Sequence, residues 1–158
     1  MGKTAYQRTS DDTVAPRRDL EGLVGYQLRR VGAQVVKELL RIFGVVGLAP
    51  GQFSILMLIA EHPGCFQMDL ARLANVDRST LVPMIERLAQ LKFIKRSQSE
   101  NDRRAFHLQV TARGRKAIDQ VMPDLRAFEE TLTDAMSARE KTTLLRSLRH
   151  VEEALLRP

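Results

Sequence analysis

Residues 70–90 of this 158-residue chain read LARLANVDRSTLVPMIERLAQ, and this stretch decides the fold. Asp77 is a residue type that accepts hydrogen bonds from the free N–H groups of a first helical turn, so it predicts a helix over Arg78–Gln90. A shorter helix precedes it and is expected to end near Asn75. Its expected inward-facing side chains are Leu70, Leu73 and Ala74. The stretch therefore predicts two helices joined by a tight turn.

The apolar period changes after these helices, from helical spacing to alternation. Residues 93–96 predict one strand and residues 105–110 predict another. In the second strand, smaller or polar residues alternate with Phe106, Leu108 and Val110. The link over residues 97–104, SQSENDRR, is polar and turn-forming, so it predicts a hairpin with a charged tip. Two helices followed by such a hairpin are typical of a winged helix-turn-helix. The expected fold class is mainly α with a small β-wing.

Upstream of this unit, the chain predicts two further helices. Along Leu20–Leu39, successive apolar residues lie four, four, three, four and four positions apart, which predicts a helix. Gly44 and Gly47 are expected to end this helix. Pro50 suits the first turn of the next helix, which the sequence His62-Pro63-Gly64 is expected to stop.

Downstream of the hairpin, two more helices are expected. Thr111 is a suitable N-terminal cap for a long helix that reaches about Met136 and bends near Pro123. Ser137 and Glu140 then form a capping box, in which each side chain bonds the backbone N–H of the other residue, so the last helix begins there. The apolar stripe of this helix consists of Leu144, Leu148, Val151 and Leu155.

The net charge of +6 is unevenly distributed along the chain. Residues 72–116 hold eleven basic and four acidic residues, a net +7, so the remaining residues have a net charge of −1. A generally solvated basic surface does not explain this segregation. Basic residues gathered on a helix pair and a hairpin are typical of nucleic-acid binding through phosphate neutralisation. A winged-helix module that binds other proteins is the alternative. The basic residues are Arg72, Arg78, Arg87, Lys92, Lys95, Arg96, Arg103, Arg104, Arg113, Arg115 and Lys116.

These patterns divide the chain into three regions. Residues 1–17 are polar and aperiodic, so we expect a polar N-terminal arm. Residues 46–111 form the expected winged helix-turn-helix DNA-binding region. Residues 18–45 and 112–158 form the expected helical dimerisation region, because their apolar stripes need a partner to cover them. An intramolecular helix pair in a monomer is the alternative.

Other classes of protein have less support. A single cysteine, Cys65, cannot form an intramolecular disulfide, and no apolar run approaches the roughly 20 residues that span a bilayer. We therefore expect a cytoplasmic protein with no membrane contact. No phosphate loop, serine-hydrolase elbow or zinc-peptidase motif is present, so we expect no enzyme. His62, His107 and His150 lack metal-ligand spacing, so we expect no metal or other cofactor, and His107 is expected to face solvent or DNA.

Helical geometry, at about 100° per residue, gives the 78–90 helix a core side and an exposed side. The core side is expected to hold Leu81, Ile85 and Leu88, with Met84 at its margin. The opposite side holds Ser79, Pro83, Glu86 and Gln90, with Thr80 and Arg87 on one flank. Hydroxyls near a helix N-terminus suit phosphate or base contacts, and an arginine suits a phosphate or a guanine edge. The expected DNA contacts are Arg78, Ser79, Thr80, Pro83 and Arg87. An ordinary solvated helix face is the alternative.

Pro83 is an unusual residue inside a helix, because it has no N–H to donate to the Ser79 carbonyl. It falls on the exposed side, so packing does not explain it. One hypothesis is that its ring contacts a thymine methyl group. The other is that a tolerated kink sets the angle of the helix in the groove.

The hairpin tip places Arg103 and Arg104 on a projecting loop, where guanidinium groups can enter a narrow minor groove. Asp102 at the same tip would be repelled by phosphates. We therefore expect Asp102 to pair with one of the two arginines and to support the wing, with a plain surface ion pair as the alternative.

Five motifs occur in order along about residues 18–156. They are Pro50-Gly51-Gln52-Phe53, His62-Pro63-Gly64, Leu70-Ala71-x-Leu73-Ala74-x-Val76-Asp77-Arg78-Ser79-Thr80, Asn101-Asp102-Arg103-Arg104 and Leu108-Gln109-Val110-Thr111-x-x-Gly114-Arg115. This ordered set resembles the MarR family of transcriptional regulators. The family consists of homodimeric winged-helix DNA binders, mostly repressors, that release palindromic sites when a small ligand, often an aromatic acid, binds.

The resemblance implies a role for each part of the chain. The 78–90 helix would enter the major groove, Arg103 and Arg104 would enter the minor groove, and the first and last helices would form the dimer interface. Two recognition helices would then lie about 34 Å apart, one turn of DNA. Two residues depart from the family pattern: Pro83 replaces a more usual polar or basic residue, and Lys92 stands where glycine is common.

The resemblance also implies an effector pocket between the dimerisation helices and the DNA-binding lobe. Tyr26, Arg29 and Arg30 on the first helix would supply an aromatic wall and a carboxylate anchor for an aromatic acid or its thioester. A surface or interface role for the arginines is the alternative. Oxidant sensing through Cys65, known in some relatives, is a second alternative. No lysine or arginine lies near Cys65 to lower its pKa. We therefore expect Cys65 to be a small, buried apolar residue.

Overall fold

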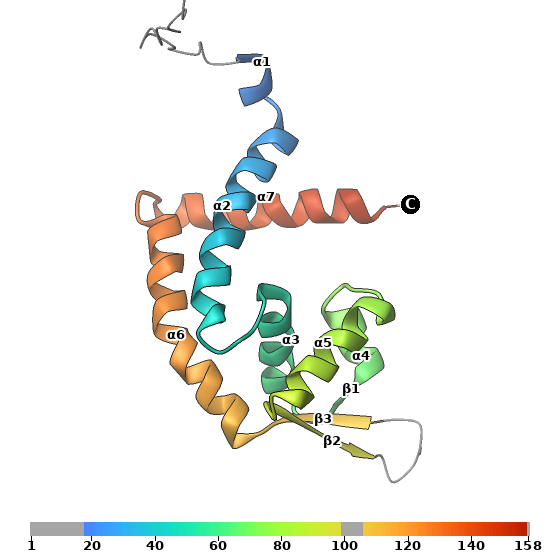
Figure 1. The fold of residues 1–158 in the computed structure, drawn as a ribbon. Helices are drawn as coiled ribbons and strands as arrows, with labels where there is room; N and C mark the ends of the chain where they lie inside the picture. Colours follow the sequence, from blue (N-terminus) through green and yellow to red (C-terminus); the bar gives the residue numbers. More distant parts are fainter. Residues whose placement is uncertain (1–17, 99–105, 158) are drawn as a thin grey trace, which may run out of the picture. The chain divides into compact units, whose positions relative to one another are not determined.

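The computed structural model describes residues 18–98 and 106–157 (Figure 1). The helices are α1 (Arg18–Glu21), α2 (Val24–Gly44), α3 (Pro50–Glu61), α4 (Gln67–Leu73), α5 (Arg78–Gln90), α6 (Ala112–Thr133) and α7 (Ala138–Leu156). The strands are β1 (Cys65–Phe66), β2 (Ile94–Gln98) and β3 (Phe106–Val110). The predicted mainly α fold with a small β-wing is confirmed. The chain forms two compact units, whose boundary falls within α2 after Lys37.

The wing is a three-stranded antiparallel sheet in the order β1-β3-β2. The hairpin of β2 and β3 was predicted, with Ile94 opposite Val110 at its base. Strand β1 was not predicted, since the sequence places Cys65 in the turn after Gly64. Cys65 instead pairs with Leu108 of β3. A two-residue strand is too short to show an alternating pattern, and its pairing partner lies more than 40 residues away in the chain.

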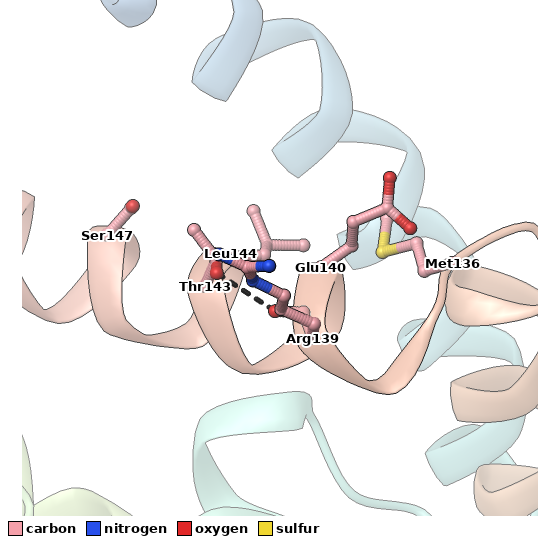
Figure 2. A pocket seen from close by; sticks show the side chains of 6 residues that line it. All are labelled: Met136, Arg139, Glu140, Thr143, Leu144 and Ser147. Atoms are coloured by element: carbon pink, nitrogen blue, oxygen red, sulfur yellow. Dashed lines mark hydrogen bonds between the residues drawn. The ribbon is translucent and has the colours of Figure 1, made fainter.

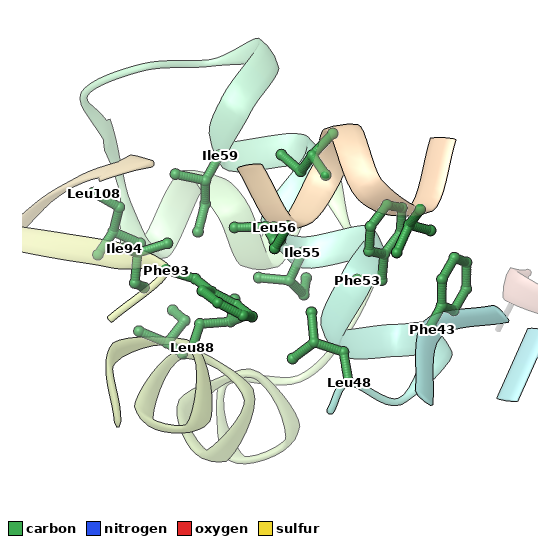
Figure 3. Packing of buried hydrophobic residues seen from close by; sticks show 14 of the residues in the cluster. Phe43, Leu48, Phe53, Ile55, Leu56, Ile59, Leu88, Phe93, Ile94 and Leu108 are labelled. Atoms are coloured by element: carbon green, nitrogen blue, oxygen red, sulfur yellow. The ribbon is translucent and has the colours of Figure 1, made fainter. Parts of the chain in front are cut away.

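The apolar core of the second unit joins α3, α5, the sheet and the first turns of α6. Figure 3 shows side chains from the end of α2, from α3, α5 and the sheet converging on one centre. The rings of Phe43 and Phe53 stack with centroids 4.3 Å apart and planes at 12°. The predicted core side of α5 is confirmed, because Leu81, Ile85 and Leu88 are fully buried. This core holds α5 against the unit by one side only.

The prediction that Leu73 faces inward is wrong. Leu70 is completely buried, whereas Leu73 is 50% exposed. A helix of only seven residues buries a narrow strip, and Leu73 lies about 60° around the axis from Leu70, in the last turn. The chain then turns through Asn75, which has a positive φ of 50°, so α4 stops before it can bury more of its surface.

The start of α6 is packed tightly against the base of the wing. Thr111 caps the helix as predicted, since its hydroxyl accepts from the Gly114 N–H at 3.0 Å. The same hydroxyl donates to the Lys92 carbonyl at 2.7 Å. A Cβ atom on Gly114 would lie only 2.1 Å from the Phe93 carbonyl oxygen, so only glycine fits there. Lys92 has a φ of +60°, the left-handed region that favours glycine.

The single helix predicted from Leu20 is divided in the structure, because α1 ends at Glu21 and α2 begins at Val24 after Gly22, a residue type that disfavours a helix interior. The other helices follow their predicted signals closely. Pro123 lies inside α6, which ends at Thr133, three residues before the expected Met136. The predicted capping box at the start of α7 is confirmed, because the Ser137 N–H donates to the Glu140 carboxylate at 2.8 Å and the Ser137 hydroxyl accepts from the Glu140 N–H at 3.3 Å. Within residues 18–98 and 106–157, no helix has the length and apolar character needed to cross a membrane.

Candidate nucleic-acid interface

Helix α5 turns its exposed side to solvent along its whole length. Arg78, Ser79, Thr80, Pro83 and Arg87, the five contacts predicted on this helix, are all exposed. They lie across the helix axis from the three buried side chains that anchor α5 in the core. The sequence pattern thus separates the two sides correctly, and the exposed side is available to a partner along the full helix.

The N-terminus of α5 is open to an anionic partner. Asp77 occupies the N-cap position as predicted, with its carbonyl accepting from Thr80 at 3.0 Å and Leu81 at 2.9 Å. Its side chain makes no capping hydrogen bond. The N–H groups of Arg78 and Ser79 therefore have no side-chain cap, and such groups bind phosphate oxygens well.

Arg87 is oriented by a contact that the sequence does not reveal. Its guanidinium donates a long hydrogen bond of 3.4 Å to the carbonyl of Gly47, in the loop between α2 and α3. Gly47 has a φ of +73°, and this conformation belongs to the tight turn that ends α2. A guanidinium has five N–H donors, so Arg87 keeps most of its donors for another partner.

The wing adds basic side chains beside this helix. Lys95 and Arg96 on β2 are exposed, and their cross-strand neighbours, Gln109 and Leu108, carry no charge. The predicted tip contacts Arg103 and Arg104, and the supporting residue Asp102, lie outside the described residues. Their roles stay predictions.

His107 has a structural role in place of the predicted solvent- or DNA-facing one. It is half-buried, and its Nδ1 lies 2.7 Å from the carbonyl oxygen of Gly64. Because a carbonyl only accepts, Nδ1 is the donor. The imidazole ring also lies against Phe66, with centroids 4.5 Å apart. His107 thereby ties β3 to β1 and to the turn that precedes it.

Ion pairing removes little of the positive charge in this region. In the described part of the chain, the ion pairs are Arg41 with Glu38 and Arg72 with Asp69. Arg72 is therefore partly neutralised by an acid just upstream of the basic segment. The other described basic residues of the segment have no acid among the described residues within ion-pair distance, so their charge is available to a polyanion.

Comparisons with known proteins agree with this geometry. The MarR family model matches residues 48–106. An inferred transcriptional regulatory protein for the hcr operon of Thauera aromatica is 29% identical over 84% of this chain and 80% of its own length. The HTH-type transcriptional regulator PecS of Dickeya dadantii is 28% identical over 89% of this chain and 87% of its own. The structure of the transcriptional repressor CouR bound to a 23-mer DNA duplex superposes with a TM-score of 0.78 at 29% identity, over 85% of this chain and 95% of that one.

The chain is similar to the MarR family of transcriptional regulators in sequence and in fold. It has the winged helix-turn-helix fold, and the comparisons support a DNA-binding transcriptional regulator. The resemblance seen in five sequence motifs is therefore confirmed. In this chain, α4 and α5 form the helix-turn-helix, and the three-stranded sheet with its β2–β3 hairpin forms the wing.

The single cysteine of the chain is poorly suited to oxidant sensing. Cys65 is half-buried in β1, and burial raises the pKa of its thiol. The thiolate, which is the reactive form, is therefore disfavoured at neutral pH. Over residues 18–98 and 106–157, no group of three or more His, Cys, Asp or Glu side chains is arranged to hold a metal ion.

The three predicted effector contacts do lie together on α2. The guanidinium carbons of Arg29 and Arg30 lie 5.2 and 5.6 Å from the centre of the Tyr26 ring. Tyr26 is half-buried and both arginines are exposed. A shallow hollow of about 500 Å³ lies elsewhere, along α7 (Figure 2). None of the three predicted contacts lines this hollow, whose residues are Met136, Arg139, Glu140, Thr143, Leu144 and Ser147.

Proposed function

We propose that this protein is a cytoplasmic, homodimeric repressor that binds a palindromic operator and is released by a small organic effector. The observation that carries the proposal is the exposed side of α5. It combines Arg78, Ser79 and Thr80 with an N-terminus that has no side-chain cap. This arrangement suits insertion into a major groove, with base contacts from the first turns and phosphate contacts at the helix end.

The similarity to CouR supports the DNA-binding part of the proposal. CouR was solved on a 23-mer DNA duplex, and the present chain covers 95% of it. A 23-mer spans about two helical turns, which is the length that two recognition helices of a two-fold dimer need. We therefore assign the major-groove role to α5 and the minor-groove role to the wing, including Arg103 and Arg104.

The apolar helices outside the winged unit support the homodimer. Large apolar side chains of α2 and of the residue that precedes it are exposed, namely Leu23, Val24, Leu28, Val31, Val36 and Leu40. Helix α7 has no buried residue, and its exposed leucines are Leu144, Leu145, Leu148, Leu155 and Leu156. Exposed large apolar side chains gathered along one helix are typical of an interface. We assign its occupant as a second copy of the chain, because a palindromic operator requires two-fold symmetry in the protein.

The effector assignment rests on Tyr26, Arg29 and Arg30. Two guanidinium groups beside one aromatic ring fit a planar carboxylate ligand, because the ring can stack and a guanidinium can bind both carboxylate oxygens. We propose an aromatic acid or its thioester as the effector class. Isothermal titration against a panel of such compounds tests this part, and the absence of heat with every member would contradict it.

The whole proposal is tested by footprinting the DNA upstream of the protein's own gene. We expect protection of two half-sites whose centres lie about 10 base pairs apart, as two-fold docking on one DNA face requires. We also expect an effector that binds Tyr26, Arg29 and Arg30 to remove the protection. Protection of a single half-site would contradict the homodimer, and no protected site on this DNA would contradict repression of neighbouring genes.

A further inference from the structure

The contact between Arg87 and Gly47 joins α5 to the turn that ends α2. The Nη2 group of Arg87 donates to the Gly47 carbonyl oxygen at 3.4 Å. A Cβ atom built on Gly47 would lie 3.8 Å from the same nitrogen, so the guanidinium lies directly against the backbone of this residue. Both residues are exposed. The contact is therefore at the surface, where DNA can reach the guanidinium.

The backbone around Gly47 is held in one conformation. The Gly47 N–H donates to the Gly44 carbonyl at 3.0 Å, and the Leu48 N–H donates to the Phe43 carbonyl at 3.2 Å. These two bonds form a Schellman motif, a helix end that needs one residue in the left-handed region, and Gly47 supplies it with its φ of +73°. Phe43 and Leu48 are buried in the core. The turn therefore holds the Gly47 carbonyl at a fixed place beside α5.

The backbone of Arg87 is fixed by the same core. Leu88, the next residue, is completely buried, and α5 stays helical through Gln90. An unrestrained arginine side chain samples many rotamers and loses this freedom when it binds a partner. The bond to Gly47 restricts the side chain before DNA binds. It engages one of the five N–H donors of the planar guanidinium, so the bond is compatible with a second acceptor.

The position of Arg87 on α5 favours a phosphate over a base as this second acceptor. At 100° per residue, Arg87 lies about 80° around the helix axis from Ser79. At 1.5 Å per residue, it also lies about 12 Å farther along the axis, in the last turn. A guanine contact needs a guanidinium that extends from the middle of the helix face into the groove. Arg87 instead lies on a flank, with its guanidinium held beside the α2–α3 loop, and this suits the sugar-phosphate backbone at the edge of the groove.

We propose that Arg87 binds a DNA phosphate and that the Gly47 carbonyl orients the guanidinium for this contact. Gly47 is then a positioning residue, which acts on DNA through Arg87. Operator affinity thereby depends on the conformation of the turn that ends α2. The inference rests on the proposed placement of α5 in the major groove.

The phosphate contact is tested with full-length Arg87→Ala by fluorescence anisotropy on the operator that footprinting locates. We expect the slope of log K against log salt to fall by about 2, one phosphate contact per protomer. The matched control is Arg126→Ala, which removes an exposed arginine of α6 and should leave the slope as it is in wild type. An unchanged slope for Arg87→Ala would overturn the phosphate assignment.

The positioning role of Gly47 is tested with a double-mutant cycle. Alanine is strained at a φ of +73°, so Gly47→Ala relaxes the turn and displaces the carbonyl. We expect Gly47→Ala to raise Kd about fivefold without changing the salt slope, because the phosphate contact is kept but the arginine is no longer ordered beforehand. In an Arg87→Ala background, the same exchange should change Kd less than about 1.5-fold.

The control for this cycle is Gly64→Ala. It introduces the same kind of strain at a φ of +82° in another turn, where a Cβ would also meet no close atom. Its effect on Kd should be equal with and without Arg87. An equal effect of Gly47→Ala in the two backgrounds would show that Gly47 does not act through Arg87.

The Gly47 carbonyl can also be observed directly by nuclear magnetic resonance, without a change at Gly47. The chain contains two Gly-Leu pairs, Gly22-Leu23 and Gly47-Leu48, so labelling glycine carbonyls with carbon-13 and leucine with nitrogen-15 gives two cross-peaks. We expect Arg87→Ala to shift the Gly47 carbonyl signal and to leave the Gly22 signal in place. An unshifted Gly47 signal would overturn the contact, whether or not Gly47→Ala folds.

The outcomes separate this inference from the proposed function. If the wild type binds no operator, the proposed function fails and this inference fails with it. If the wild type binds its operator and the cycle shows no coupling between Gly47 and Arg87, the positioning role is overturned while DNA recognition stands.

Discussion

Replacing Gly114 with alanine should strongly destabilise the protein, although the change adds a single methyl group. Gly114 is buried in the first turn of α6, where the helix meets the base of the wing. The added Cβ would lie 2.1 Å from the Phe93 carbonyl oxygen and 2.9 Å from a methyl group of Val110. Two such atoms need at least about 3.0 Å, so the helix and the strand must separate by about 1 Å.

The separation acts on the bonds that fasten α6 to the wing. The Thr111 N–H donates to the Phe93 carbonyl at 2.9 Å, and the Thr111 hydroxyl donates to the Lys92 carbonyl at 2.7 Å. Overpacking costs about 1–3 kcal/mol, and each weakened hydrogen bond costs about 1 kcal/mol. We expect a loss of about 3 kcal/mol in the free energy of unfolding. For a chain of this size that lowers Tm by about 6–12 °C.

Thermal unfolding followed by circular dichroism measures this loss. Wild type and variant should be compared at one protein concentration, because Tm depends on concentration in a dimer. The control is Gly44→Ala, whose Cβ would meet no atom within 4 Å. It should change Tm by no more than about 2 °C. A decrease for Gly114→Ala no larger than that of Gly44→Ala would refute the close approach of α6 to Phe93.

Three further predictions concern single residues. Lys92→Gly should raise the free energy of unfolding by about 0.5–1 kcal/mol, since glycine suits the φ of +60° without strain; a lower Tm would contradict this. Arg78→Ala should reduce the slope of log K against log salt for duplex DNA by about 2, one phosphate contact per protomer, and an unchanged slope would show that Arg78 does not touch phosphate. Hydrogen bonds from Ser137 lower the pKa of Glu140, so the stabilisation is complete above the unfolded pKa of about 4.3 and is lost as pH falls through the folded pKa. Stability should therefore fall more between pH 6 and pH 3 in wild type than in Glu140→Gln, and equal losses would contradict the capping role.

Features encoded in local sequence were predicted well. The bounds of α5 came out as expected, since Asp77 marks its start and the apolar period of Leu81, Ile85 and Leu88 marks its core side. The caps at Thr111 and Ser137 were also confirmed, because a capping interaction involves residues only three positions apart. Five of the seven predicted DNA contacts belong to α5, and their exposure follows from the same helical period.

Features that depend on distant contacts were missed. Strand β1 exists through pairing with β3, and the His107 bond to Gly64 joins residues 43 positions apart. The Arg87 bond to Gly47 spans 40 positions, so no local pattern indicates it. Gly114 was recognised as part of a motif. The reason that glycine is needed there, its close approach to the Phe93 carbonyl oxygen, is visible only in the packed structure.

The most direct test of the central claim, that α5 carries DNA binding, compares two matched double variants by fluorescence anisotropy on the operator that footprinting locates. One is Arg78→Ala with Thr80→Ala on α5, and the other is Arg126→Ala with Thr131→Ala on α6, where both side chains are also exposed. We predict that the α5 variant raises Kd about 100-fold, since each protomer loses a charged and a hydroxyl contact, while the α6 variant changes Kd less than about threefold. Equal effects of the two variants would contradict the assignment of α5 as the recognition helix.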